Sequence, residues 1–285
     1  MSLLRLASTL LAAVFGIASA PGAAAATINV TAGQNLNQIL EDAAAGDVVV
    51  VGPGTYTAQG TVCLPNAAQF SIRKPLTVMS SDGPEATILQ QPDTGGPLPA
   101  VLITHGVCTS SFVADVVLEG FTLVDGVAVA TQGIPAQRIR LGNLLVNSSA
   151  PRPGVSFENA RDSTIDGSVV DVLGRAISVT NSRDVFVTNN SLRTTGATQA
   201  VYLDQTLNSV VAGNTVWGAG ADAILLSATT SSRFERNTIS GHRYDGIRVT
   251  NGVSASSSNF IGYNTIVSNG WAGGIETSGN GIVLS

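Results

Sequence analysis

The sequence has few charged residues and almost no lysine. Charged residues make up 12% of the chain, aromatic residues make up 5%, and Lys74 is the only lysine. Acidic residues outnumber basic ones, so the formal net charge is −5. Proteins bind nucleic acids through clearly basic surfaces. We therefore expect no nucleic-acid partner.

Soft metal ligands are equally scarce. The chain holds two histidines, His105 and His242, together with two methionines and two cysteines. Copper and other soft metals need a cluster of such donors, and this small set predicts none. Cys63 and Cys108 either form a disulfide in an oxidising compartment or stay as two buried thiols. The sequence leaves both options open.

Long apolar runs are absent except at the N-terminus. There Arg5 is followed by the run LASTLLAAVFGIASA and then by the alanines at 23–26. This layout is typical of a secretory signal peptide, and the run is short for a membrane anchor. We predict a signal peptide at residues 1–26, a mature domain at residues 27–285 without a membrane span, and an exported protein, extracellular or periplasmic.

Glycine, small polar residues and branched aliphatics are abundant instead, which favours strands and turns. They also repeat. One element, such as VVAGNTVW, recurs with its glycine or asparagine at spacings of 23, 24, 23, 24, 23 and 27, at Gly120, Asn143, Gly167, Asn190, Asn214, Asn237 and Asn264. A second element, such as AVYLDQT, keeps the same period and starts at Gly154, Ala176, Ala200, Ala223 and Gly246.

This period predicts the fold. Repeats of about 23 residues without helical patterning are typical of coils that stack in parallel, about 4.8 Å apart. The fold class is therefore all-β, a right-handed parallel β-helix with regular coils at residues 115–285. Equivalent residues stack, so Asn190, Asn214, Asn237 and Asn264 are expected to form a ladder of amides. Leucine-rich horseshoes and propellers differ in leucine spacing or in period.

Residues 27–56 predict a cap and a first strand. A short amphipathic helix carries Leu36, Ile39, Leu40 and Ala43 on one face, ends at Gly46, and is followed by the strand DVVVV. Such a helix can cover the open end of a coil stack. The helix, VVVVGPGTY and the later NTI and DGI rows resemble the pectin-lyase-like superfamily of secreted β-helices. The resemblance covers nearly the whole mature chain, but this fold hosts many activities.

The last residues, GWAGGIETSGNGIVLS, offer no comparable cap and end inside a predicted strand. An open strand edge invites pairing with another chain. Self-association at this coil is therefore one expectation.

In the resembling families, sugar chains lie along the outer face of the strand that reads AVYLDQT here. Strand alternation directs every second side chain outward. Two outer columns are therefore expected, Ser156, Ser178, Tyr202, Leu225 and Arg248 in one and Glu158, Thr180, Asp204, Ser227 and Thr250 in the next. A third column precedes the strand and consists of Arg175, Gln199, Asp222 and Asp245.

These columns predict a groove for an anionic polysaccharide. The expected substrate-binding residues are Arg175, Arg243, Tyr244 and Gln199. The resemblance implies lyase- or epimerase-like β-elimination, for which the candidate catalytic groups are Arg248, Asp245, Tyr202 and His242. No cofactor is required, and one option is Ca²⁺ held by Asp204, Asp222 and Asp245.

A simpler interpretation remains open. Asp222 and Asp245 precede strands at positions where aspartate commonly caps turn amides. Tyr202 and Trp217 are either sugar platforms or ordinary surface aromatics. On this interpretation the protein is a non-catalytic surface, adhesin or scaffold β-helix.

Two specific activities are disfavoured. Polygalacturonase-type hydrolases carry three aspartates and a histidine in three successive rows, and the matching positions here are Gln199, Ala221, Asp222 and Asp245. Only one of these four residues matches. The Tyr-Gly-Phe-Asp-Pro-His signature of alginate epimerases is also absent from the sequence, which weakens that option.

Overall fold

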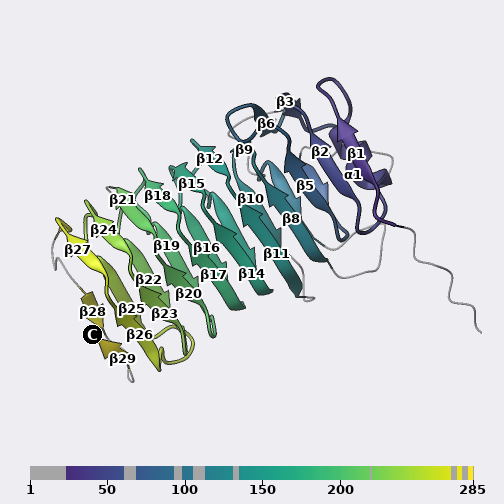
Figure 1. Ribbon diagram of the computed structural model, residues 1–285. Coiled ribbons are helices and arrows are strands. Elements are labelled where there is room, and N and C mark those ends of the chain that lie inside the picture. Colours follow the sequence, from purple (N-terminus) through teal and green to yellow (C-terminus); the bar gives the residue numbers. More distant parts are fainter. Residues whose placement is uncertain are drawn as a thin grey trace, which may run out of the picture.

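The computed structural model describes residues 24–60, 69–92, 98–104, 113–130, 135–218, 220–270, 275–277 and 282–284. Within these ranges the chain winds into a right-handed parallel β-helix with three sheets along its length (Figure 1). The predicted fold class is confirmed. Most of the predicted signal peptide, Cys63, Cys108, His105 and most of the C-terminal coil lie outside the described residues.

Sheet A contains eleven parallel strands, in stacking order β1 (Thr27–Val30), β2 (Val48–Val51), β5 (Thr77–Ser80), β8 (Ala114–Glu119), β11 (Ala136–Gly142), β14 (Ala160–Asp166), β17 (Arg183–Thr188), β20 (Val210–Ala212), β23 (Arg233–Glu235), β26 (Asn259–Gly262) and β29 (Ile282–Leu284). Sheet B contains nine, β3 (Gly54–Thr57), β6 (Thr87–Gln90), β9 (Thr122–Val124), β12 (Leu145–Ser148), β15 (Val169–Val172), β18 (Ser191–Thr194), β21 (Thr215–Gly218), β24 (Thr238–Ser240) and β27 (Thr265–Val267). Sheet C also contains nine, β4 (Phe70–Ile72), β7 (Val101–Ile103), β10 (Val127–Ala130), β13 (Val155–Glu158), β16 (Ile177–Thr180), β19 (Val201–Asp204), β22 (Ile224–Ser227), β25 (Ile247–Thr250) and β28 (Ile275–Thr277).

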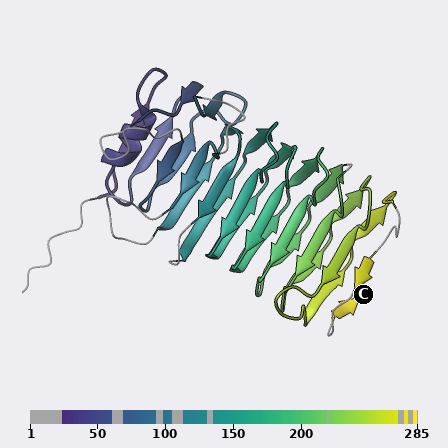
Figure 2. The same cartoon turned by 180° about the vertical axis from the view of Figure 1, so that it is seen from behind.

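Each coil passes through sheets A, B and C in that order, which gives nine three-stranded coils in the described residues. The coils stack on one another in chain order, from the N-terminal to the C-terminal end (Figure 2). The stack begins well before residue 115, because β2 to β7 already form two coils. We name the turns between the sheets the A–B, B–C and C–A corners.

The interior is filled by stacked aliphatic side chains. Val201, Ile224 and Ile247 are register partners in neighbouring coils, and each is fully buried. The alternation of a β-strand places such residues inside and their neighbours outside. Burial of this continuous apolar column is the main favourable term for folding.

The predicted amide ladder runs along the A–B corner. The side-chain oxygen of Asn214 accepts hydrogen bonds from the backbone N–H (2.9 Å) and side-chain amide (3.0 Å) of Asn190. Asn237 does the same for Asn214, and Asn264 for Asn237. The ladder continues downward, since Ser168 donates its N–H to Asn190. These bonds satisfy the polar groups of a buried turn.

A second ladder, which the sequence did not predict, follows the C–A corner. The backbone N–H of Ser209 donates to the Ser232 hydroxyl at 3.0 Å, and that of Ser232 donates to the Asn259 side chain at 3.0 Å. Ser182 accepts likewise from Ala160. Serine is common throughout the chain, so these positions do not stand out in the sequence as the asparagines do.

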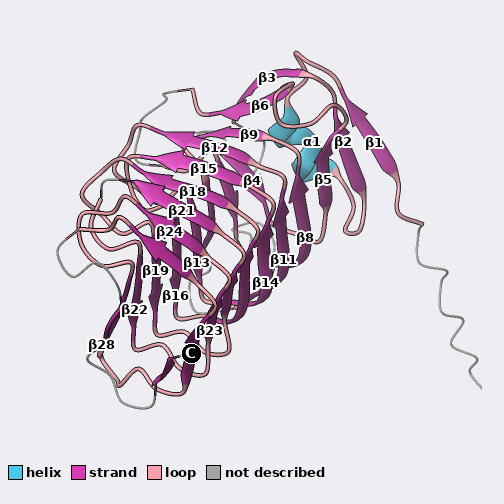
Figure 3. Ribbon diagram, turned by 60° about the vertical axis from the view of Figure 1, so that its left-hand side comes forward, coloured by secondary structure: helices cyan, strands magenta, loops and turns pink. Residues whose placement is uncertain are grey.

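The N-terminal end is capped as predicted, with two differences. Helix α1 (Leu36–Asp42) packs Leu36 and Leu40 into the end of the core, and Figure 3 shows it beside the first strands. The helix ends at Asp42 rather than at Gly46. A strand also precedes it, because β1 pairs with β2 and so begins sheet A.

Candidate functional site

The outer face of sheet C carries most of the residues that the sequence singled out. Tyr202, Leu225 and Arg248 are register partners on three successive coils. Ser156 and Ser178 continue this column below Tyr202. The second column is in register as well, through Asp204 and its partners. The vertical stacking predicted from the period is therefore confirmed.

Arg175, Gln199 and Tyr202 are brought together at the start of this face. The Arg175 guanidinium lies over the Tyr202 ring, 4.0 Å from its centroid. Its Nε donates to Gln199 Oε1 at 3.4 Å. All three side chains are partly exposed. A cation–π contact at this distance orients the guanidinium without neutralising its charge, so Arg175 presents a positive group on the surface.

The column of Arg175 and Gln199, which precedes the strands of sheet C, becomes buried in the later coils. Asp222 and Asp245 are both 3% exposed, and Asp222 Oδ1 accepts the backbone N–H of Asp245 at 3.1 Å. Asp222 therefore caps the following turn, as the simpler interpretation anticipates. Within the described ranges, no three His, Cys, Asp or Glu residues are grouped so that they could hold a metal ion. Asp204, Asp222 and Asp245 are thus not assembled into a calcium site.

His242, Arg243 and Tyr244 lie together in the B–C corner before β25. The Arg243 guanidinium lies 5.4 Å from the centroid of the Tyr244 ring. His242 is 3% exposed, and its burial lowers the pKa of the imidazole to about 4. The ring is therefore neutral at pH 7 and shielded from solvent. It does not share the exposed surface of Tyr202 and Arg248.

A loop borders the far end of this face. Residues 251–258 connect β25 to β26 and lie against the preceding coils. A Cβ atom added to Gly252 would stand 2.4 Å from the Ser227 hydroxyl and 3.3 Å from Asp204 Oδ1. Asp204 therefore lies beside this loop rather than on an open ledge.

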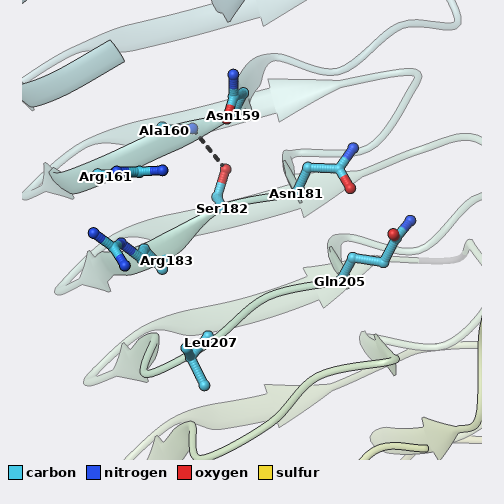
Figure 4. Close-up of a pocket in the computed structure, with 8 residues that line it drawn as sticks. All are labelled: Asn159, Ala160, Arg161, Asn181, Ser182, Arg183, Gln205 and Leu207. Atoms are coloured by element: carbon cyan, nitrogen blue, oxygen red, sulfur yellow. Dashed lines mark hydrogen bonds between the residues drawn. The ribbon is translucent and has the colours of Figure 1, made fainter. Parts of the chain in front are cut away.

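A hollow of about 330 Å³ lies at the C–A corner, next to the strand ends of sheet C (Figure 4). Asn181 and Gln205 line one side, and Arg161 and Arg183 line the other. Arg161 and Arg183 are register partners on β14 and β17. The hollow therefore adds two arginines from successive coils to the edge of sheet C, and the Nε of Arg183 also lies 3.8 Å from Asp184 Oδ2.

Sequence reasoning missed these two arginines, although a signal was present. The motif Asn-x-Arg-Asp occurs at residues 159–162 and again at residues 181–184. Asn159 and Asn181 both adopt positive φ angles, 54° and 49°. Asparagine tolerates this left-handed conformation better than most residues, so the repeated motif makes the same turn twice and stacks its arginines.

Comparison with known proteins identifies a family and several solved structures with a similar fold. Residues 125–284 match the model of the family described as "Periplasmic copper-binding protein (NosD)". No curated protein matches the sequence. No helix in the described part of the chain has the length and apolar character of a membrane span.

The similar solved structures share the architecture. DFA-IIIase from Arthrobacter chlorophenolicus A6 in complex with GF2 has a TM-score of 0.63 at 17% identity, over 85% of this chain and 71% of that one. ORF18 of Geobacillus virus E2 has a TM-score of 0.62 at 13% identity, over 91% and 61%. Pectate lyase Pel9A has a TM-score of 0.56 at 13% identity, over 91% and 77%. At these identities the likeness concerns the fold alone.

The matched family is described as copper-binding, so the donors on this chain matter. Copper prefers imidazole nitrogen and sulfur ligands. Among the described residues these are limited to His242 and Met79. Met79 lies in β5 and His242 follows β24, so many coils separate them (Figure 1). These two residues do not fit a copper centre.

Proposed function

The family model covers more than half of the chain, so the protein belongs to the NosD family of periplasmic proteins, and we propose that it binds an acidic polysaccharide along sheet C. The binding surface comprises the outer face of sheet C and the C–A corner beside it. Chain export and removal of residues 1–26 are part of this proposal. The start of β1 at Thr27 supports a mature chain that begins there.

The observation that carries the proposal is the arrangement of arginines. Arg175 and Arg248 flank Tyr202 and Leu225 on sheet C, while Arg161 and Arg183 stack at the adjoining corner. A guanidinium binds a carboxylate through two parallel hydrogen bonds. Successive rungs lie about 4.8 Å apart, so arginines on different coils can meet carboxylates on different sugars of one chain.

Binding is better supported than cleavage. Of the four candidate catalytic groups, Asp245 and His242 are buried, which leaves Tyr202 and Arg248 on the surface. Tyr202 and Arg248 are separated by the Leu225 rung, so a single sugar would not contact both closely. The proposed binding needs no metal ion, because arginines supply the positive charge.

Titration calorimetry with polygalacturonate and alginate at low ionic strength tests the proposal. Arg175→Ala should weaken binding about tenfold to a hundredfold, the equivalent of one charge-assisted hydrogen bond. Arg233→Ala is a control for the loss of one arginine elsewhere, because Arg233 stacks on Phe260 at 4.6 Å and pairs with Glu235 on sheet A, away from the proposed surface. A chelator should leave the affinity unchanged.

Two results would overturn the proposal. The first is a lack of binding to every polyuronate. The second is an equal loss in Arg175→Ala and Arg233→Ala, which would indicate diffuse attraction rather than a site. Ultraviolet absorbance from unsaturated products would restore the lyase hypothesis in place of simple binding.

A further inference from the structure

Trp217 lies in β21, on the outer face of sheet B rather than on that of sheet C. It is 41% exposed. Its column neighbours are known from the register. Asp171, Arg193, Trp217 and Ser240 follow one another on β15, β18, β21 and β24.

One side of the indole is already occupied. The Arg193 guanidinium lies over the ring, 4.7 Å from its centroid. Arg193 is itself held from the coil below, because its Nη1 donates to Asp171 Oδ2 at 2.9 Å. Cation–π and ion-pair contacts together fix the orientation of the ring. They also leave this part of the surface without net charge.

Arg193 lies on the coil before Trp217, and the coil after Trp217 contributes a short side chain to this column. Ser240 is the register partner of Trp217 on the next coil, and its hydroxymethyl group is too small to cover the ring. A hollow of about 500 Å³ opens here, lined by Arg193, Thr194, Thr195, Trp217, Gly218, Ser240 and Gly241. Ligand sites commonly have volumes of about 300–1,000 Å³.

At one position in the lining of this hollow, backbone packing excludes any side chain. Gly218 has a φ of 144°, and a Cβ atom added there would lie 2.2 Å from the carbonyl oxygen of Thr194. No other residue fits that position without moving the backbone. Gly241, one coil further on, also lines the hollow. The hollow is thus a fixed feature of the coil stack.

We propose that this hollow binds a neutral sugar, with one pyranose ring stacked on the open face of Trp217. The apolar C–H face of a pyranose matches an aromatic ring, and the polar edge of the sugar needs hydrogen-bonding partners. The hydroxyls of Thr195 and Ser240 line the hollow and supply them. Asp171 compensates the charge of Arg193, so an uncharged glycan suits this site. The site does not depend on the acidic-glycan surface of sheet C.

Tryptophan fluorescence gives a direct test. The chain has two tryptophans, so a Trp271→Phe background leaves Trp217 as the only emitter. Titration with cellohexaose and xylohexaose should change its emission in a saturable way and shift it to the blue, because a stacked sugar displaces water. No saturable change with either oligosaccharide would overturn the proposal.

Two variants separate the stacking contact from the fold. Trp217→Ala should weaken binding of the responding oligosaccharide at least tenfold by calorimetry. Ser240→Arg keeps the tryptophan but covers its open face, and it should cause a similar loss while emission still reports a folded protein. Unchanged affinity in Ser240→Arg would show that the sugar binds elsewhere.

A third variant separates this site from the sheet C surface. Arg175→Ala should leave neutral-sugar binding and the Trp217 response unchanged. Equal loss of both ligands in Arg175→Ala would contradict the existence of a second, independent site.

Discussion

The outer faces of sheets B and C each carry an arginine stacked on an aromatic ring, but the two arginines have different polar partners. On sheet C, Arg175 stacks on Tyr202 and bonds to the neutral side chain of Gln199. On sheet B, Arg193 stacks on Trp217 and pairs with the carboxylate of Asp171. The positive charge is therefore open on one face and compensated on the other.

This difference teaches how a solenoid sets the chemistry of its faces. Parallel register places every outer residue between one neighbour from the coil below and one from the coil above. A single substitution a full coil away in sequence therefore decides whether the charge of an arginine is compensated. The two faces share the same coils, so changes to the scaffold should affect them together and changes to a column should affect them separately.

The largest expected effect is on the shared scaffold. Asn214→Ala removes an amide that accepts from Asn190 and donates to Val187 and Asn237. Each buried polar group left without a partner costs about 1–3 kcal/mol, so we expect a loss of roughly 2–4 kcal/mol in the free energy of unfolding, measured with urea. Asn264→Ala, near the end of the ladder, should cost less. A loss no larger than that of a surface substitution would contradict the contribution of the ladder to stability.

Acid should lower the stability of the fold at the B–C corner, which joins the two faces. Burial lowers the pKa of His242 to about 4 from its usual 6.5, so the unfolded chain binds more protons between these values. The contribution of His242 to stability is therefore complete above about pH 6.5 and declines as the pH falls towards 4, by at most about 3 kcal/mol. Urea unfolding at pH 7 and pH 4.5 measures this loss. His242→Leu should show a shallower pH dependence, and an unchanged slope would exclude this histidine as the cause.

A smaller effect is expected when Arg175 on sheet C is given a carboxylate partner like that of Arg193 on sheet B. Gln199→Glu places a carboxylate beside Arg175, whose Nε already lies 3.4 Å from the side-chain oxygen of residue 199. An ion pair at an exposed site is worth up to about 1 kcal/mol. Polyuronate affinity should therefore fall about fivefold in calorimetry, and neutral-sugar binding at Trp217 should not change. Gln199→Asn is the uncharged control.

The reverse change should have the smallest effect. Asp171→Asn frees the charge of Arg193 while leaving it stacked on Trp217. We expect polygalacturonate to gain weak binding at this site, by a few-fold over the parent protein at low ionic strength. Trp217 emission in the Trp271→Phe background reports it. If polygalacturonate does not change the Trp217 emission of this variant, charge is not what distinguishes the two faces.

The fold and the columns were predictable because the period alone fixes which residues stack. The ladder from Asn190 to Asn264 and the column of Tyr202, Leu225 and Arg248 followed from spacing and strand alternation. Strand β1 was missed because four alternating residues before a helix are a weak local signal. Its place is decided by pairing with β2.

Burial and side-chain direction could not be predicted in the same way. Asp222 and Gln199 hold equivalent positions in successive coils, yet the first is buried and the second is partly exposed. The corners at residues 195–200 and 241–246 have equal lengths, yet Gln199 is partly exposed and Asp245 is buried, so the difference depends on packing that the spacing does not reveal. Arg175 likewise reaches the ring of Tyr202 on the next coil. The repeat gives the position of each residue but not the direction of its side chain, so this contact could not be predicted.

Parallel pairing from one coil to the next also determines how such a protein can change in length. In the described part of the chain each inner coil pairs with the coil before it and the coil after it. A duplicated segment of one period would therefore fit into the stack and leave the remaining registers intact. Both surfaces would then lengthen by the same step, and a longer polymer could be held without any new kind of contact.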